Sequence, residues 1–322
     1  MTPGLHVLEP GGSIGARRDW PVVCIPVYGA HSLFVACLRS VLSHTPLDVP
    51  IVVADDASPD RDSEAFVREI AAGVGFEHEF WYLLQPHNLG FVENVNTVFD
   101  ATAPADVILL NSDTEVGPEW AERLRAAAYS DTTIATASAF TNHGTILSVP
   151  FRNQPQPDLP PGLAVDPAAT AVAEASLRLY PRIPTALGHC VYVRRSAIDL
   201  VGTFDPAFSP GYGEEVDFSQ RCVLRGLVHV AADDVLVLHR GSASFTANSR
   251  QEEHEQEIAR RYPYYHLVVD RAANRQTGPL PRSLAIAARA LEGRPKVTID
   301  ARCLGPTVTG TQVHALELIH AL

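Results

Sequence analysis

Residues Val107–Val116 read VILLNSDTEV, a run of four apolar residues that ends on Asn111, Ser112 and Asp113. A short apolar run bounded by polar residues is typical of a strand buried on both faces of a parallel sheet. Such a strand rarely ends on a carboxylate unless a cation binds there. Asp113 is therefore a candidate ligand for Mg²⁺ or Mn²⁺, and its alternative roles are a helix cap or a partner for Lys or Arg.

Three further apolar runs precede this one, and segments with apolar residues at helical spacing separate them. The predicted strands cover residues 21–28, 48–58, 79–86 and 106–113, and the predicted helices lie at about 33–42, 61–72 and 91–103. This alternation predicts an α/β fold with a mostly parallel central sheet and helices on both faces. Ligands bind such a sheet at the carboxyl ends of its strands. The polar residues expected at that edge are Tyr28, Asp55, Asp56, Asn88 and Asp113.

The second half of the chain is less regular. A Pro-rich loop at 151–167 is expected beside the ligand-binding edge as a mobile flap. Strands are predicted at 188–195 and 228–239, and helices at 196–202, 214–225 and 249–262. The last strand ends on His239, which is either a structural histidine or an auxiliary metal ligand.

Composition narrows the class of protein. The chain has 322 residues, of which 46% are apolar, and a net charge of −12. An acidic surface does not favour a nucleic acid as partner, because that binding needs a basic footprint. The five cysteines are scattered without a Cys-x-x-Cys pair, and no signal peptide or membrane-spanning run is apparent. We expect a soluble cytoplasmic protein.

The stretch GYGEEVDFSQRCVLRG, residues 211–226, crowds Glu214, Glu215 and Asp217 into the first turn of a helix. The helix dipole explains one or two acidic residues there, but three carboxylates in four positions repel one another. One of them at the mouth of a polar cleft could act as a general base on a substrate hydroxyl.

Two other motifs allow a binding role and a local structural role. Asp55 and Asp56 are either a metal-binding or phosphorylatable pair, or the start of a turn that their side chains stabilise. Asn88 and Gly90 precede a predicted helix, where backbone N–H groups favour an anion, although Asn88 is also a common turn residue. The loops typical of NTPases, dinucleotide enzymes and serine hydrolases are absent from the sequence.

Seven segments between Val22 and Phe245 together resemble the family 2 glycosyltransferases, inverting enzymes with the GT-A fold, and especially their rhamnosyltransferase-like members. The segments are IPVY (25–28), VVADDAS (52–58), NLGF (88–91), LLNSDTEV (109–116), RRSAIDLVGTFDPAF (194–208), GEEVDFSQR (213–221) and LHRGSAS (238–244). They occur in the order that the family shows. The resemblance implies a GT-A fold and transfer of a sugar from a nucleoside-diphosphate sugar.

The resemblance also implies roles for residues along the donor. Those assigned to the nucleotide sugar are Pro26, Val27, Tyr28, Asp55, Asp56, Asn88, Gly90, Asn111 and Ser112. The first three would flank the base, the two aspartates would contact base or ribose, and the next two would lie along the nucleotide. The last two belong to the segment that matches the family's Asp-x-Asp motif, whose first position is Asn111 here.

For the metal and the chemistry, the resemblance implies Asp113 and His239 as ligands of Mn²⁺ or Mg²⁺. The family's catalytic base is the second residue of a Glu-Asp pair, which is Glu215 in this chain, and Glu214 or Asp217 is a possible substitute. Gly188 and His189 match a segment near the acceptor.

The implied reaction is a single displacement that inverts the anomeric centre. A metal would stabilise the departing diphosphate, and a carboxylate would take the proton of the acceptor hydroxyl. The donor would be a UDP- or dTDP-sugar, and the acceptor a glycan or lipid-linked molecule in cell-surface polysaccharide assembly. This acceptor class implies contact with the inner face of the membrane without a transmembrane segment.

The expected organisation has four parts. Residues 1–19 form a disordered leader, 20–265 the GT-A domain and 266–295 a helical or linker segment. Residues 296–322 read strand, Gly-rich loop and helix, and resemble the start of a family 4 glycosyltransferase, which has the GT-B fold. We expect this to be the truncated start of a second, fused glycosyltransferase domain, or an extra unit on the main domain.

Two other functions fit parts of the pattern. A nucleotidyltransferase also holds a metal on a related sheet, but it normally has a basic Gly-rich loop after the first strand, and PVYGAHSLF has no Lys or Arg. A non-catalytic module could bind a sugar nucleotide or a partner protein with the same fold. The cost of keeping three neighbouring carboxylates favours an enzyme.

Overall fold

The computed structural model describes residues 4–18, 20–241 and 250–292, together with 312, 313 and 317. Its centre is a ten-stranded sheet in the order β1-β4-β3-β2-β5-β9-β7-β10-β6, with β8 paired to β10. The strands are β1 (Gly4–Leu8), β2 (Val22–Val27), β3 (Ile51–Asp55), β4 (Glu79–Leu84), β5 (Val107–Leu110), β6 (Thr114–Glu115), β7 (Ile134–Thr141), β8 (Arg182–Ile183), β9 (Cys190–Val193) and β10 (Val228–His239).

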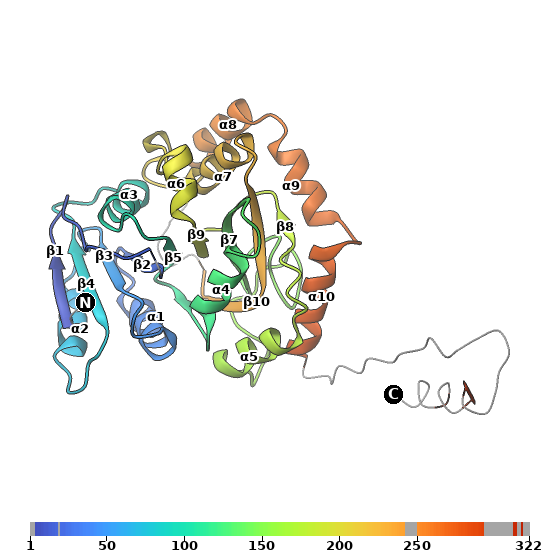
Figure 1. The fold of residues 1–322 in the computed structure, drawn as a ribbon, viewed down its shortest axis with the longest axis horizontal. Helices are drawn as coiled ribbons and strands as arrows, with labels where there is room; N and C mark the ends of the chain where they lie inside the picture. The colour runs from blue at the N-terminus through green and yellow to red at the C-terminus, as the bar shows by residue number, and fades with distance from the viewer. Residues whose placement is uncertain (1–3, 19, 242–249, 293–311, 314–316, 318–322) are drawn as a thin grey trace.

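Ten α-helices and one 3₁₀ helix are present in the described part of the chain (Figure 1). They are α1 (His31–His44), α2 (Asp62–Ala71), α3 (Phe91–Ala101), α4 (Trp120–Ala128), α5 (Val165–Ala175), α6 (Arg195–Val201), η1 (Pro206–Phe208), α7 (Glu214–Leu224), α8 (Gln251–Arg261), α9 (Tyr265–Asn274) and α10 (Pro279–Leu291). Helices α1, α2 and α4 pack on one face of the sheet, and α3, α6, α7 and α8 pack on the other.

Strand β2 shows how the sequence builds both layers. Side chains alternate across a strand, so Val23, Ile25 and Val27 enter the core under α1, whereas Val22 and Cys24 enter the core under α3. All five are nearly inaccessible to solvent. Because β2 is buried on both faces, it reads as a continuous apolar run.

The predicted α/β fold, a mostly parallel sheet covered on both faces, is confirmed. Strands β1, β4, β3, β2 and β5 are parallel neighbours, and β7 and β10 form another parallel pair. Strand β9 joins the two groups by pairing antiparallel with β5 and β7. The carboxyl ends of β2, β3 and β5 therefore meet at one edge, beside the end of β10.

The ends of the chain differ from the expected organisation. The leader, predicted to be disordered, contains β1, which pairs in parallel with the exposed side of β4. Further along the leader, Ile14 and Ala16 are buried in the core. In the segment predicted as helix or linker, helices α9 and α10 occupy most of residues 266–292, and Leu280, Leu284 and Leu291 of α10 pack with α5 and β10. The prediction for 296–322 falls outside the described residues, apart from three isolated positions.

Among the residues that the structure describes, no helix combines the length and the apolar character needed to cross a bilayer.

Asp106 provides a test of the packing that holds β5. Its buried carboxylate accepts hydrogen bonds from the Tyr129 and Tyr192 hydroxyls, both at 2.6 Å, and from the Arg195 backbone N–H at 2.7 Å. Asp106→Ala should lower the free energy of unfolding by about 2–4 kcal/mol, because three donors lose a charged acceptor. Urea denaturation measures this, with the exposed Asp100→Ala as control. Equal stability of the two variants would contradict the role of Asp106.

Candidate active site

The register of β10 brings His239 onto Asp113. Strand β10 pairs antiparallel with β6, and His239 stands opposite Thr114. The backbone N–H of Arg240 also donates to the Asp113 carbonyl at 3.0 Å. As a result, His239 Nε2 lies 3.3 Å from Asp113 Oδ1, and both side chains are largely buried. Two residues 126 positions apart thus form one polar pair at the edge of the sheet.

The neighbouring Asn142 and His143 orient His239. The Asn142 side chain accepts from the His239 N–H at 2.7 Å and donates to the His239 carbonyl at 3.0 Å. His239 Nδ1 donates to the His143 carbonyl at 3.0 Å, because a carbonyl only accepts. This bond leaves Nε2 as the ring atom that faces Asp113. Sequence reasoning missed both residues, since they follow β7, a strand that it did not predict.

Electrostatics at this pair favour a positive partner for Asp113. Burial lowers the pKa of His239, but the hydrogen bond and charge of Asp113, with the bond to His143, outweigh burial and raise that pKa. A carboxylate beside an oriented imidazole also fits a divalent cation that takes its other ligands from a diphosphate. The described residues contain no group of three or more His, Cys, Asp or Glu side chains arranged for a metal. Asp113 and His239 offer such an ion one carboxylate oxygen and one imidazole nitrogen.

The carboxylates of Asp55 and Asp56 bind their own chain. Asp55 accepts from the Ser58 N–H at 2.7 Å and from the Tyr82 hydroxyl at 2.5 Å. Asp56 accepts from the N–H groups of Leu89 and Gly90 at 2.7 and 2.9 Å, and burial raises its pKa. Both side chains are almost inaccessible. In this structure they shape the turn after β3 and the approach to α3, which is the turn-forming alternative of the sequence analysis.

Gly90 is required by a close contact with Pro210. Its φ of +83° lies in the left-handed region, and a Cβ placed there would be 2.7 Å from the Pro210 Cβ. The Phe91 N–H donates to the Pro210 carbonyl at 2.7 Å. The loop at Leu89 and Gly90, which Asp56 holds, is thereby hydrogen-bonded to Pro210, four residues before Glu214.

The remaining residues predicted for the nucleotide differ in accessibility. Pro26 and Val27 are buried at the end of β2, whereas Tyr28 is 45% exposed and Asn88 is exposed. Tyr28 thus presents an aromatic ring at the carboxyl edge. Asn111 and Ser112 lie in the turn between β5 and β6, with Ser112 buried.

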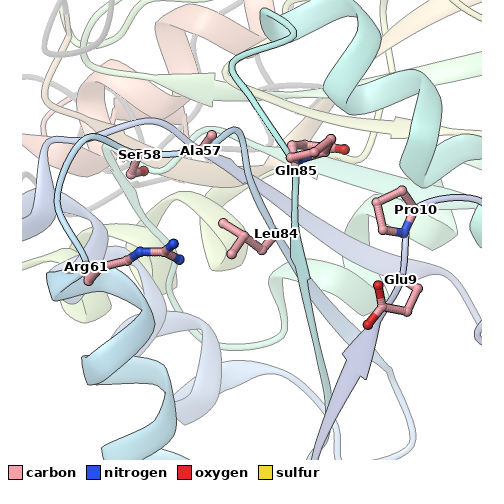
Figure 2. A pocket seen from close by; sticks show the side chains of 8 residues that line it. Glu9, Pro10, Ala57, Ser58, Arg61, Leu84 and Gln85 are labelled. Carbon is pink, nitrogen blue, oxygen red and sulfur yellow. The ribbon is translucent and has the colours of Figure 1, made fainter.

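A separate hollow of about 440 Å³ lies at the carboxyl ends of β1, β3 and β4. Its lining residues are Glu9, Pro10, Ala57, Ser58, Arg61, Leu84, Gln85 and Pro86. Figure 2 shows Leu84 between Arg61 on one side and Glu9 and Pro10 on the other. None of the predicted site residues lines it. It adjoins the end of β3, since Ser58 and Gln85 both hydrogen-bond to Asp55.

Asp217, the last of the three carboxylates in α7, is a structural anchor. It is fully buried and accepts from Arg221 Nε, Arg261 Nη1 and the Tyr262 hydroxyl, each at 2.8 Å. These donors belong to α7 itself and to the end of α8. With its oxygens so occupied, Asp217 is not available to a substrate.

Glu214 is not satisfied in this way. Glu214 is 7% exposed, and its Oε2 has no hydrogen-bond partner among the described residues. Burial, and then the charge of Glu215, raise the pKa of Glu214 well above its usual value. Burial also raises the pKa of Glu215, while backbone N–H groups and the proton of Glu214 oppose this. Burial of the two neighbouring carboxyl groups thus favours their protonated form over that of an ordinary glutamate.

A loop of six residues, Pro184–His189, contacts both His239 and helix α7. At one end, the Asn111 N–H donates to the His189 carbonyl at 3.0 Å, and the His189 ring stacks on His239 with centroids 5.7 Å apart. At the other end, the Ala186 N–H donates to Ser219 Oγ, which donates to the Glu215 carbonyl. One loop, which contains the predicted Gly188 and His189, thus contacts His239 directly and helix α7 one turn after Glu215.

His189 is buried, and its Nε2 has no hydrogen-bond partner among the described residues. Burial and the charge of His239 lower its pKa to about 3, so the ring is neutral. The sequence pointed to His189 and Gly188 only through the family resemblance, and it did not identify Thr185, another buried residue of this loop.

The pH dependence of stability tests the burial of Glu214. Between the usual pKa of 4.5 and the raised pKa, only the folded state holds the proton, so stability falls as pH rises through this window. Glu214→Gln cannot ionise and should raise the melting temperature more at pH 8 than at pH 5. The exposed Glu174→Gln is the control and should show no such difference. A Glu214→Gln effect that is equal at both pH values would show that the carboxyl titrates normally.

Comparison with known proteins places this site in a family. The family model described as glycosyl transferase family 2 matches residues 22–202, more than half of the chain. No curated protein matches the chain significantly.

Solved structures share the fold at low identity. GalNAc-T7 with UDP, GalNAc and Mn²⁺ is 17% identical, with a TM-score of 0.57 over 84% of this chain and 54% of that one. Mannosyltransferase PcManGT from Pyrobaculum calidifontis, with GDP-Man and Mn²⁺, is 16% identical, with a TM-score of 0.53 over 95% and 79%. S. aureus TarS 1-349 with UDP-GlcNAc is 14% identical, with a TM-score of 0.50 over 84% and 71%. The chain spans about half the length of GalNAc-T7. It belongs to glycosyl transferase family 2 and has the GT-A fold.

Proposed function

We propose that this enzyme is an inverting, metal-dependent transferase that moves a sugar from a UDP- or dTDP-sugar to a hydroxyl of a glycan or lipid-linked acceptor. The observation that carries the proposal is that one loop, Pro184–His189, stacks its His189 ring on His239 and hydrogen-bonds through Ala186 to Ser219, one helical turn after Glu215 in α7. The carboxylate and imidazole of Asp113 and His239 suit a divalent cation, and the carboxyl groups of Glu214 and Glu215 suit the acceptance of a proton. A glycosyl transfer needs both within the length of a sugar.

At the metal end, Asp113 and His239 would hold Mn²⁺ or Mg²⁺. The cation would neutralise the negative charge that grows on a departing diphosphate. Two of the similar structures contain Mn²⁺ with a nucleotide or nucleotide sugar, which supports this donor class. Asn142 and His143 would keep His239 oriented, since they bind its backbone and its Nδ1.

At the nucleotide end, Tyr28 would contact the base from the end of β2, with Pro26 and Val27 behind it. Asp55 and Asp56 would act on the nucleotide indirectly, by holding the turn at Ser58 and the loop at Leu89 and Gly90. Asn88 and Gly90 would line the path of the nucleotide, and Asn111 and Ser112 the path of its phosphates.

At the acceptor end, Glu215 is the proposed general base. It would take the proton from the acceptor hydroxyl while that oxygen attacks the anomeric carbon. The bond between the anomeric carbon and the phosphate oxygen breaks at the same time, and the diphosphate leaves with the electron pair. Glu214 would hold a proton and keep Glu215 available. Attack opposite the leaving group inverts the anomeric centre.

The cellular role follows from the acceptor class. We propose that the enzyme serves cell-surface polysaccharide assembly in the cytoplasm, in contact with the inner face of the membrane when the acceptor is lipid-linked. A surface that carries a net charge of −12 supports a sugar or lipid-linked acceptor over a nucleic acid.

The donor and the metal can be tested together. UDP-, dTDP- and GDP-sugars are screened by thermal shift with Mn²⁺ and with a chelator, because a bound ligand stabilises in proportion to its affinity. For the best donor, Asp113→Ala should weaken metal-dependent binding by at least about tenfold in calorimetry, as one of the two protein ligands is lost. Asp158→Ala is the control, since Asp158 pairs with the adjacent Arg240. Unchanged Mn²⁺ and donor affinity in Asp113→Ala would remove Asp113 from the metal site.

The base can be tested by turnover. Glu215→Gln should lower kcat by about 10²–10⁴-fold, the usual contribution of a general base, and leave donor affinity nearly unchanged. The exposed Glu253→Gln should behave like the unaltered enzyme. Proton NMR of the product reports whether the anomeric centre is inverted. Normal turnover of Glu215→Gln with loss in Glu214→Gln would assign the base to Glu214, and a retained configuration would refute the single displacement.

A further inference from the structure

Helix α9 exposes large apolar side chains on its outer face. None of the residues of this helix is fully buried. Tyr264, which precedes it, is 39% exposed, and Leu267 and Val268 are 56% and 41% exposed. Residues three, four and seven positions apart share one face of a helix, so these side chains form an outer stripe that continues to Arg271. Because a surface helix normally turns its apolar side chains to the core, this contiguous stripe indicates an interaction surface.

Contacts on the inner side of α9 fix which face is turned outward. Tyr265 packs against the core under α3 and α7, and Ala273 packs against the cluster that contains α5 and α10. At the C-terminal end, the Arg152 guanidinium donates to the carbonyls of Ala272 and Arg275. The helix is thus held at both ends, and the outer stripe faces away from the sheet.

Helices α9 and α10 are basic, although the protein is acidic. Residues 265–291 contain four arginines and one aspartate, a net charge of +3, whereas the whole chain carries −12. All four arginines are exposed, and in the described part of the chain none of them forms a salt bridge. They are Arg271, Arg275, Arg282 and Arg289. The charge of this surface therefore complements an anionic partner.

Helix α10 extends the basic surface. Its residues Leu280, Leu284 and Leu291 pack with α5 and β10, and Arg282 and Arg289 lie on the opposite, exposed side of the helix. Figure 1 shows α9 and α10 in succession along one side of the molecule. Helix α8, which precedes them, carries four glutamates and two arginines, so the basic surface begins at α9.

Helix α9 also begins close to the proposed base. The Tyr265 N–H donates to the Tyr262 carbonyl at 2.9 Å, and the Tyr262 hydroxyl donates to Asp217 at 2.8 Å. Asp217 belongs to the first turn of α7, as do Glu214 and Glu215. A bilayer that lies against α9 would therefore hold a lipid-linked acceptor near the groups proposed to activate its hydroxyl.

We propose that the outer stripe of α9, with the exposed arginines of α9 and α10, docks the enzyme on an anionic lipid bilayer. The apolar side chains of Tyr264, Leu267 and Val268 enter the boundary between headgroups and acyl chains, and the arginines bind lipid phosphate groups. The rest of the protein carries a large negative charge, so such a bilayer repels it and selects this one orientation. The inference rests on the proposed function for its purpose, but docking itself needs neither donor nor acceptor.

The test measures binding of the full chain to vesicles without any nucleotide sugar. Vesicles of phosphatidylcholine alone are compared with vesicles that also contain phosphatidylglycerol. The unaltered enzyme should sediment with the anionic vesicles, and high salt should weaken this binding. Leu267→Gln should lower the partition constant by about tenfold, because an apolar side chain is lost from the boundary. Arg271→Gln should lower it by about fivefold, the contribution of one arginine near an anionic surface.

Matched controls come from exposed residues elsewhere on the chain. Leu47→Gln and Arg225→Gln should bind the vesicles like the unaltered enzyme, since both residues are exposed and lie outside α9 and α10. All four variants should keep the melting temperature of the unaltered enzyme, because each replaces an exposed side chain. If Leu267→Gln lowers that temperature, Arg271→Gln against Arg225→Gln still decides the result.

Three results would overturn the proposal. They are absence of binding to the anionic vesicles, equal binding to neutral vesicles, and equal binding by the α9 variants and the controls. Sedimentation without vesicles detects another occupant, because a dimer that Leu267→Gln dissociates would assign the stripe to a second copy of the chain. Release of nucleotide from a sugar donor is measured separately in solution, so a failure of the proposed function leaves the vesicle result intact.

Discussion

The candidate active site depends on the two-residue pairing between β10 and β6. This pairing sets His239 opposite Thr114 and so brings its ring to Asp113. Because side chains alternate across a strand, a shift of one residue would turn the imidazole to the other face. The Asn142 side chain stabilises the observed register, since it hydrogen-bonds to both the N–H and the carbonyl of His239. The site is thus a product of sheet register, and its two residues are otherwise unrelated in the sequence.

Buried carboxylates divide into two kinds in this enzyme. Asp55, Asp56, Asp106 and Asp217 each accept two or three hydrogen bonds from their own chain, and these bonds compensate the cost of burial. Glu214 keeps an oxygen without a partner, and its neighbour Glu215 is less enclosed. The first kind stabilises the fold, whereas the described residues leave the hydrogen-bonding capacity of Glu214 unfilled. Acidic residues in a row therefore do not share one role.

The sequence predicted the parallel half of the sheet because β2, β3 and β5 are apolar on both faces. It missed β7, whose sequence IATASAFT is rich in small and hydroxylic residues, although all eight are buried. That strand is stabilised by specific bonds, such as Thr136 Oγ1 to His229 Nδ1 at 2.7 Å, which leave no pattern in the sequence. Strand β1 was missed for a related reason. Its Gly/Pro-rich surroundings favour a loose segment, and only pairing with β4 makes it a strand.

The candidate site shows the same division. Strand ends can be located from sequence, so Asp113, His239 and the Glu pair were identified. Which carboxylates bind their own backbone depends on loops that meet only in three dimensions. For this reason Asp217 was grouped with its two neighbours in the sequence analysis. In the structure, Arg261 and Tyr262 donate hydrogen bonds to its carboxylate.

The bonds of Asp217 also determine where this enzyme can be divided. The match to the family ends at residue 202, and strand β10 ends at His239. These two limits suggest a truncated fragment that ends soon after His239. Such a cut would remove two of the three donors to a fully buried negative charge and would uncover the apolar surface under α8 and α10. A fragment that folds on its own therefore has to include the C-terminal helices α8 and α10, although both lie outside the match to the family.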